Sequence, residues 1–285
     1  MSRSHARLLD QFYTAPALAH DLVTRLRAHL GPRAEGARWM EPSAGAGAFL
    51  DALPADTVAL DIDPADPRVV QADFLKRAFP PDPAWIVVGN PPFGKNSTLA
   101  VQFFNHAAHF AQVIAFIVPR TFQKASVQRR LAREFHLEVE LEVPQDAFIF
   151  EGQPVHVPCV FQIWARQAVP RVNQVWPTTH PDFLYTTPDQ ADFAFQRVGA
   201  RAGAIKDIGP LGRGLSAPSH HFIRVTDREQ VVQVRQRFEA LDWTGIKHRT
   251  AGNPSIAKTE IVAHYQAAKA ASCPGETFGI SSSGA

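Results

Sequence analysis

Four consecutive residues, Asn90-Pro91-Pro92-Phe93, combine groups that suit chemistry on an amine attached to a flat ring. An asparagine amide oxygen and a main-chain carbonyl can accept hydrogen bonds from the –NH₂ group, an aromatic ring can stack on the planar system, and prolines keep the turn rigid. The tetrad follows the apolar run 85–88, which predicts a buried strand. We therefore expect the tetrad at a strand end, presenting an exocyclic amine to an electrophile. A proline-stiffened turn without chemistry is the alternative.

A loop of small residues upstream of the tetrad predicts a small-molecule site. The run 38–40 predicts a short strand, and it leads into residues 41–50, which include Gly45 and Gly47. The backbone of such a loop can approach a ligand closely before a helix begins. The loop lacks the three-glycine spacing of dinucleotide sites and the Gly-Lys-Ser/Thr ending of phosphate-binding loops. A nicotinamide cofactor and ATP hydrolysis are therefore disfavoured.

Acidic residues follow the next two predicted strands. The strand expected at 57–60 ends at Asp61-Ile62, where a carboxylate can accept hydrogen bonds from ribose hydroxyls. A solvated turn carboxylate is the alternative for this position. The strand expected at 68–72 leads to Asp73-Phe74, a pair suited to the amino group and the face of an adenine. Because the carboxyl ends of parallel strands share one edge of a sheet, we expect all these groups along the same edge as the tetrad.

This order of motifs resembles that of class I S-adenosylmethionine-dependent methyltransferases, and the tetrad resembles that of enzymes acting on adenine N6. The segment Asp10-Gln11-Phe12-Tyr13-Thr14-Ala15-Pro16 resembles the Phe-Tyr-Thr-Pro segment that closes over the cofactor. Its place before the glycine loop is that of the γ group of DNA adenine methyltransferases. The resemblance covers roughly residues 10–165. Ala15 separates Thr14 from Pro16, which are adjacent in many members, so the contacts of Thr14 stay open.

The resemblance implies a role for each residue of the site. The cofactor would be S-adenosyl-L-methionine, held by Tyr13, Thr14, Glu41, Ser43, Ala44, Gly45, Gly47, Asp61, Ile62, Asp73 and Phe74. The catalytic residues would be Asn90, Pro91, Pro92 and Phe93. Contacts with nucleic acid, DNA in the first place, are expected from Lys95, Asn96, Arg120, Lys124 and Phe148. No metal is expected, because the histidine pairs of the sequence lack a further ligand.

The implied reaction is direct transfer of a methyl group to the N6 amine of adenine in DNA. Asn90 and the Pro91 carbonyl would hold the amine and Phe93 would stack on the base, so that alignment supplies most of the acceleration. A base stacked in a duplex is out of reach, so the target must be flipped out or unpaired. Phe148 and Phe150 are candidates for the second face of the base, with burial in the core as the alternative.

Other functions stay open. RNA adenine-N6 methylation uses the same tetrad, and glutamine-N5 methylation of proteins presents the same planar –NH₂ group, although those enzymes generally have tyrosine in place of Phe93. A non-catalytic nucleic-acid-binding subunit could retain the fold, but the intact Asn90, Asp61 and glycine loop argue against it. Cys159 follows Pro158, a pair that also occurs in cytosine-C5 methyltransferases. Its place inside a predicted strand disfavours that chemistry.

The composition is that of a globular protein, with 285 residues, 45% hydrophobic and 20% charged residues and a net charge of +2. The net charge does not indicate a nucleic-acid-binding protein, but basic residues gather between Arg120 and Arg133, where a solvated face is the alternative. We find no run of eighteen apolar residues and no signal peptide, so we expect a cytoplasmic protein without a membrane partner. Cys159 and Cys273 form neither a disulfide framework nor a zinc-site spacing.

Alternating strand and helix patterns predict an α/β fold with a doubly wound, mostly parallel sheet over residues 1–165, and the resemblance implies seven strands. Residues 166–285 are expected to form a small α+β appendage, a reduced target-recognition domain or a cap, with a mobile tail from Ser272. Further strands are expected at 113–118, 137–143, 157–164, 193–198 and 221–225. Helices are expected from Pro16 to Leu30 and at 99–110, 127–135, 229–241 and 255–266. The oligomeric state stays open.

Overall fold

The chain forms two compact units, Met1–Gln174 and Val175–Ala285. The computed structural model describes residues 13–81, 84–145, 147–150, 153–155, 157–172, 177–209, 215–250 and 252–272. The first residues of the expected closing segment, Asp10 to Phe12, and the expected tail beyond Ser272 lie outside these ranges.

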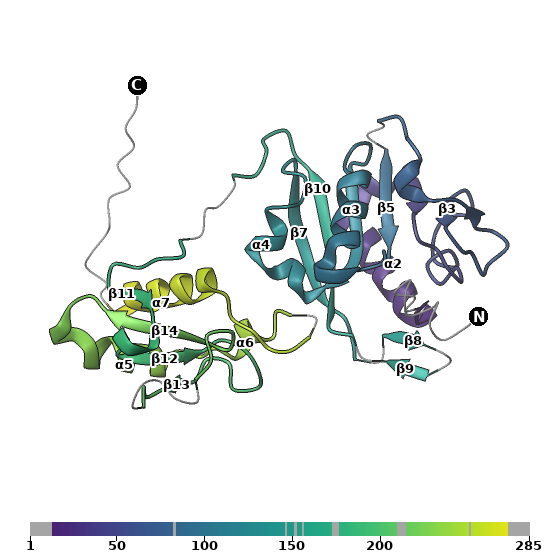
Figure 1. Cartoon of the computed structure of the whole chain (residues 1–285). Coiled ribbons are helices and arrows are strands. Elements are labelled where there is room, and N and C mark those ends of the chain that lie inside the picture. Colours follow the sequence, from purple (N-terminus) through teal and green to yellow (C-terminus); the bar gives the residue numbers. More distant parts are fainter. Residues whose placement is uncertain are drawn as a thin grey trace, which may run out of the picture. The chain divides into compact units, whose positions relative to one another are not determined.

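The first unit is built on a seven-stranded sheet in the order β4-β3-β2-β5-β6-β10-β7 (Figure 1). Strands β2 to β6 run parallel, whereas β10 is antiparallel to both β6 and β7. The strands are β2 (Arg38–Glu41), β3 (Val58–Asp61), β4 (Val70–Gln71), β5 (Trp85–Gly89), β6 (Val113–Pro119), β7 (Phe135–Glu142) and β10 (Cys159–Arg166). The predicted doubly wound, mostly parallel sheet of seven strands is confirmed.

Helices cover both faces of this sheet. On one face Val87 and Ile114 pack in a hydrophobic cluster with α3 (Thr98–Ala107), and on the other Val88 packs in a cluster with α2 (Pro16–Leu30). Strands buried on both faces carry continuous apolar runs, which explains why the central strands could be found from the sequence. The carboxyl ends of β2, β3 and β5 therefore lie together at one edge.

The helix expected at 127–135 is wrong. The chain forms only a four-residue helix, α4 (Ala125–Gln128), and then turns until β7 begins at Phe135. Arg171, forty residues further along, donates its guanidinium hydrogens to the carbonyls of Gln128, Leu131, Ala132 and Phe135. These carbonyls are satisfied without a regular helix, because a distant side chain takes the place of helical N–H groups.

The helix expected after the glycine loop is also replaced by turns. The amides of Gly47, Leu50 and Leu53 each donate to the carbonyl three residues earlier. Phe49, which is 1% exposed, packs in the same cluster as α2 and fixes these turns to the sheet.

A three-stranded sheet lies beside the main one and carries the start of the described chain. Strands β8 (Phe148–Phe150) and β9 (Gln153–Val155) form a hairpin between the strands expected at 137–143 and 157–164, and β1 (Tyr13–Thr14) pairs with β8. Thr14 lies opposite Phe148, and the Ala15 amide donates to the Ala147 carbonyl at 3.0 Å. This pairing fixes the backbone of the segment that was expected to close over a cofactor.

The second unit contains a four-stranded antiparallel sheet in the order β11-β14-β12-β13, and the predicted small α+β appendage is confirmed. Its core is aromatic and includes Phe183, Phe193, Phe195, Phe238 and Tyr265. The elements are β11 (Phe183–Thr186), β12 (Phe193–Gln196), β13 (Ile205–Lys206), β14 (His220–Val225), α5 (Val231–Ala240), α6 (Thr244–Lys247) and α7 (Lys258–Ser272).

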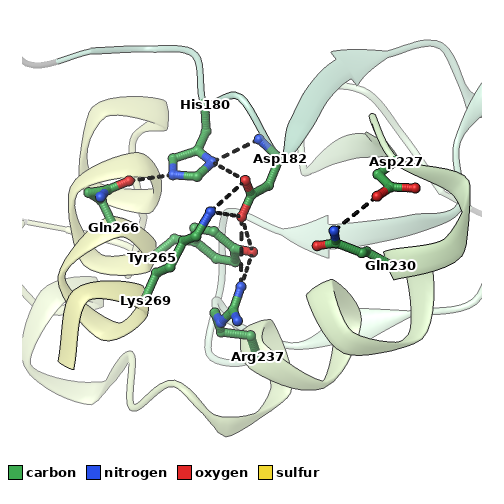
Figure 2. A network of polar contacts seen from close by, with 8 residues as sticks. All are labelled: His180, Asp182, Asp227, Gln230, Arg237, Tyr265, Gln266 and Lys269. Atoms are coloured by element: carbon green, nitrogen blue, oxygen red, sulfur yellow. Dashed lines mark hydrogen bonds and ion pairs between the residues drawn. The ribbon is translucent and has the colours of Figure 1, made fainter. Parts of the chain in front are cut away.

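A polar network joins the start of β11 to α7 in this unit (Figure 2). The Asp182 carboxylate accepts hydrogen bonds from Lys269 at 2.8 and 3.0 Å and from the Tyr265 hydroxyl at 3.0 Å. Arg237 donates to the same hydroxyl at 2.8 Å, and His180 lies 2.6 Å from the Gln266 amide oxygen. These contacts are internal to the second unit and hold its last helix on the sheet.

Candidate active site

A cavity of about 280 Å³ opens at the carboxyl edge of β2, β3 and β5. Its size is near the lower end of small-molecule sites, roughly 300–1,000 Å³. The residues that line it are Tyr13, Thr14, Glu41, Pro42, Ser43, Ala44, Gly45, Ala46, Ala48, Phe49, Asp61, Ile62, Ala72, Asp73, Phe74, Leu75, Asn90, Pro92, Leu99 and Phe103. Except for Gly47, every residue that the sequence suggested for a cofactor is in this set, together with Asn90 and Pro92 of the tetrad.

The Asp61 carboxylate is held beside the glycine loop by two main-chain amides. The Gly45 amide donates to Oδ2 at 2.8 Å, and the Asp63 amide donates to Oδ1 at 2.8 Å. Gly45 has φ +51°, and a Cβ there would lie 3.1 Å from a ring carbon of Tyr13, so both the backbone conformation and the close approach require glycine. The carboxylate keeps lone pairs for further donors, as the hydroxyls of a ribose would need.

Burial of the Tyr13 ring and the nearby charges of Asp61 and Asp63 raise the pKa of its phenol, so Tyr13 stays neutral. Gly47 contacts a different group. It has φ +79°, and a Cβ there would lie 2.6 Å from the Asp66 carboxylate, so Gly47 allows the close approach of the loop that follows β3.

Glu41 is a buried acid in the wall of the cavity. It is 2% exposed, and its Oε2 atom has no hydrogen-bond partner among the described residues. Burial, and then the negative charge of Asp61, raise the pKa of Glu41 to about 8. A buried carboxyl oxygen without a donor is costly, and a positively charged ligand would satisfy it. The methionine part of S-adenosylmethionine is such a ligand, so the acid of this cavity fits that cofactor.

Asn90 reaches the same cavity from the end of β5 and is held by two hydroxyl groups. Its Nδ2 donates to Thr14 Oγ1 at 3.3 Å, and Ser43 Oγ donates to its main-chain carbonyl at 3.1 Å. Pro91 is buried. Phe93 is half-buried and packs against the hydrophobic clusters of both sheet faces, and neither residue lines the cavity. Asn90 and Pro92 are therefore the tetrad residues that the structure brings to the cavity.

The five residues that were expected to contact nucleic acid do not line the cavity. Phe148 is fully buried in the core, so its ring is not available to a base, and the side chain of Phe150 lies outside the described residues. Arg120 forms an ion pair with Glu142 at 2.5 Å. Lys95 and Asn96 are exposed directly after the tetrad, and Lys124 is half-buried.

Hydrophobic residues of the site were missed by the sequence analysis. Leu99 and Phe103 of α3 and Leu75 after β4 line the cavity. Leu99 and Phe103 could have been predicted from the apolar face of the helix that follows the tetrad. Their place over the cavity depends on the turn before α3, where Asn96 and Ser97 both have positive φ, 54° and 59°.

Two other chemistries can be compared with the geometry. Cys159 is buried on β10, and burial raises the pKa of its thiol far above the ordinary value, which opposes a thiolate nucleophile. Among the described residues, no three His, Cys, Asp or Glu side chains come together as a metal site would require. None of the helices within the described ranges is long and apolar enough to cross a membrane.

No family model matches the sequence, and no curated protein matches it either. A Pyrococcus horikoshii protein whose structure is named as that of an RNA methyltransferase is 18% identical, covering 55% of this chain and 87% of its own, with a TM-score of 0.43. The 23S rRNA methyltransferase ErmE is 19% identical over 57% of this chain and 72% of its own, with a TM-score of 0.39.

A type I restriction-modification methyltransferase subunit from Streptococcus thermophilus is 16% identical, with a TM-score of 0.41, and covers 89% of this chain and 57% of its own. The strand order and directions described above identify the architecture of the first unit. It has a Rossmann-like methyltransferase fold.

Proposed function

We propose that this protein is an S-adenosylmethionine-dependent methyltransferase that acts on the exocyclic N6 amine of adenine in DNA. The observation that carries the proposal is one shared cavity, lined by the acids expected for the cofactor, Glu41 and Asp61, and by the Asn90 amide expected for the amine. In this proposal residues 1–165 bind the cofactor and perform the reaction, and residues 166–285 act as a reduced target-recognition domain or a cap.

Glu41 and Asp61 would hold two different parts of the cofactor. The carboxyl group of Glu41 would accept the positive charge of the methionine part, Asp61 would accept hydrogen bonds from the ribose, and Asp73 with Phe74 would contact the adenine. When bound, S-adenosylmethionine supplies an electrophilic methyl group on a positively charged sulfur. The apolar side chains of Phe49, Leu99 and Phe103, which line the cavity, would help to exclude water from it.

Asn90 would prepare the target amine for attack. Its amide oxygen and the Pro91 carbonyl would accept hydrogen bonds from the two N6 hydrogens, which draws the nitrogen lone pair out of conjugation with the ring. The enzyme gains rate by alignment of the amine with the methyl group. The methylated nitrogen then gives up one proton to water. Phe93 would stack on the base once its half-buried ring is turned toward it.

Nucleic acid would approach from the side of the tetrad. Lys95 and Asn96 are exposed next to it, and Lys124 lies past the end of β6. Arg120 would contact phosphate only after leaving Glu142, with which it forms an ion pair. Binding through these cations would weaken with salt, because phosphate contacts release counterions.

The direct test is transfer of labelled methyl from S-adenosylmethionine to duplex DNA, single-stranded DNA, structured RNA and cell protein, followed by nucleoside analysis. N6-methyladenine in DNA is the expected product. Label confined to RNA would show that the substrate is RNA instead of DNA, with the same tetrad in use. Label confined to protein would indicate glutamine-N5 methylation. Absence of label with cofactor bound would indicate a missing partner, and failure to bind the cofactor would favour a non-catalytic subunit.

The Asn90→Ala variant tests the assigned mechanism. We expect transfer to be abolished and cofactor affinity to stay within about twofold of the wild type, because the amide acts on the amine and contributes little to cofactor binding. Asp56→Asn, which changes an exposed carboxyl group away from the cavity, is the matched control. Activity retained by the Asn90 variant would contradict the mechanism.

A further inference from the structure

Two hydroxyl groups that were expected to serve the cofactor are directed at Asn90. Thr14 Oγ1 accepts a hydrogen bond from the Asn90 side chain at 3.3 Å, and Ser43 Oγ donates to the Asn90 main-chain carbonyl at 3.1 Å. One contact therefore fixes the side chain of Asn90 and the other fixes its backbone. The two hydroxyls come from different segments, before and after α2.

The position of the Thr14 hydroxyl is determined by the fold. Thr14 is 6% exposed and lies in β1, where its backbone pairs with Phe148 of β8. Phe148 is in turn fully buried in the core of the first unit. The hydroxyl is thus held by a short sheet that is anchored in the core, and it is not part of an exposed flexible segment.

An asparagine amide needs such a partner to present the correct end. Its oxygen and nitrogen have nearly the same shape, and rotation about the terminal torsion has broad, roughly two-fold preferences, so hydrogen bonds decide which atom faces a ligand. If the amide were turned over, its –NH₂ group would meet the –NH₂ group of the target, and two donors would face each other. In this structure Thr14 Oγ1 accepts from Nδ2, so the bond holds the amide in the orientation in which Oδ1 is presented as the acceptor.

We propose that Thr14 is a positioning residue that holds the catalytic Asn90 amide in place at the cavity, with Ser43 fixing the Asn90 backbone. The proposal rests on the proposed function, and it gives Thr14 a role on the amine side of the cavity. The extra residue Ala15, between Thr14 and Pro16, contributes to the backbone pairing that holds Thr14. Its amide pairs with Ala147, which continues the β1–β8 pairing past Thr14.

The test compares Thr14→Val, which keeps the shape but removes the hydroxyl, with Thr14→Ser, which keeps the hydroxyl. With the best acceptor among duplex DNA, single-stranded DNA and structured RNA, we expect kcat of Thr14→Val to fall roughly tenfold, the effect of losing one positioning hydrogen bond. The cofactor Kd should stay within about twofold, and Thr14→Ser should recover most of the rate. A raised cofactor Kd with unchanged kcat would overturn the proposal.

A second readout does not depend on catalysis. The side-chain amide signals of Asn90, identified in ¹⁵N-edited NMR spectra by their loss in Asn90→Asp, should shift in Thr14→Val and stay near the wild-type position in Thr14→Ser. Unchanged signals in Thr14→Val would overturn the positioning role even in an active enzyme. Shifted signals in Thr14→Val, together with a wild-type protein that methylates none of the acceptors, would support the contact and overturn the proposed function instead.

Discussion

Glu41 is a residue whose suitability for a ligand destabilises the empty protein. Its carboxyl group is 2% exposed, and burial together with Asp61 raises its pKa from 4.5 to about 8. The folded state therefore binds a proton more tightly than the unfolded state does. The free energy of unfolding is highest below the unfolded pKa and falls as pH rises from 4.5 to 8. At pH 7 this loss amounts to about 3 kcal/mol.

The Glu41→Gln variant should remove this loss. In the absence of cofactor we expect its Tm to exceed that of the wild type, by little at pH 5 and by several degrees at pH 8, because the amide has no proton to lose. Cofactor affinity should fall, since the negative charge is gone. Thermal unfolding across this pH range measures the difference, with Asp56→Asn as the exposed control. A stability gain that does not change with pH would contradict the assigned ionisation.

The lining of the cavity could be predicted from the sequence where a residue lies at or just past the end of a strand. Glu41, Asp61 and Asn90 were placed at one edge because buried parallel strands are visible as apolar runs and their carboxyl ends share an edge. The Thr14–Asn90 contact could not be found, because it depends on the pairing of β1 with β8. The sequence left Phe148 with two possibilities, contact with the base or burial in the core. Only the β8–β9 hairpin shows that its ring enters the core.

At the scale of elements, the helix expected at 127–135 failed through a contact that no local pattern contains. Val127, Leu131 and Phe135 have helical spacing and are all buried, so the apolar pattern was real. Arg171 supplies donors to four carbonyl groups of this turn, and its charge lies 5.1 Å from the centre of the Trp164 ring. Burial of Arg171 lowers the pKa of its guanidinium, which nonetheless stays protonated.

Removal of this side chain should destabilise the first unit. For Arg171→Ala we expect a loss of about 2–4 kcal/mol in the free energy of unfolding, because several carbonyls would lose charged donors in a partly buried place. Arg171→Lys should recover only part of the loss, since an ammonium group cannot span the four carbonyls. Denaturant unfolding measures both, and Arg129→Ala, at an exposed position of the same turn, is the control. Equal stability of Arg171→Ala and wild type would mean that the turn persists without the guanidinium.

At the scale of the whole molecule, each of the two units has its own hydrophobic core, and all the described residues that line the candidate cavity belong to the first unit. The second core is closed by α7, which the Asp182 network holds to the start of β11 (Figure 2). Burial would raise the pKa of Asp182, but the hydrogen bonds from Lys269 and Tyr265 outweigh it and hold the pKa below the ordinary value. The stability that Asp182 provides is therefore present above the unfolded pKa of about 3.9 and is lost as pH falls below it.

Asp182→Asn should loosen the second unit and leave the first unaffected. The carboxamide cannot compensate the charge of Lys269, so we expect a loss of about 1–3 kcal/mol in the free energy of opening of α7. Hydrogen exchange on the full chain measures it, as faster exchange in Lys258–Ser272 and Phe183–Thr186. Exchange in β5 and the cofactor Kd should not change, because the cavity is built entirely by the first unit. Asp189→Asn, at an exposed position, is the control. A change in cofactor Kd in Asp182→Asn alone would show that the second unit acts on the site, and the two units would then have to be treated as one functional body.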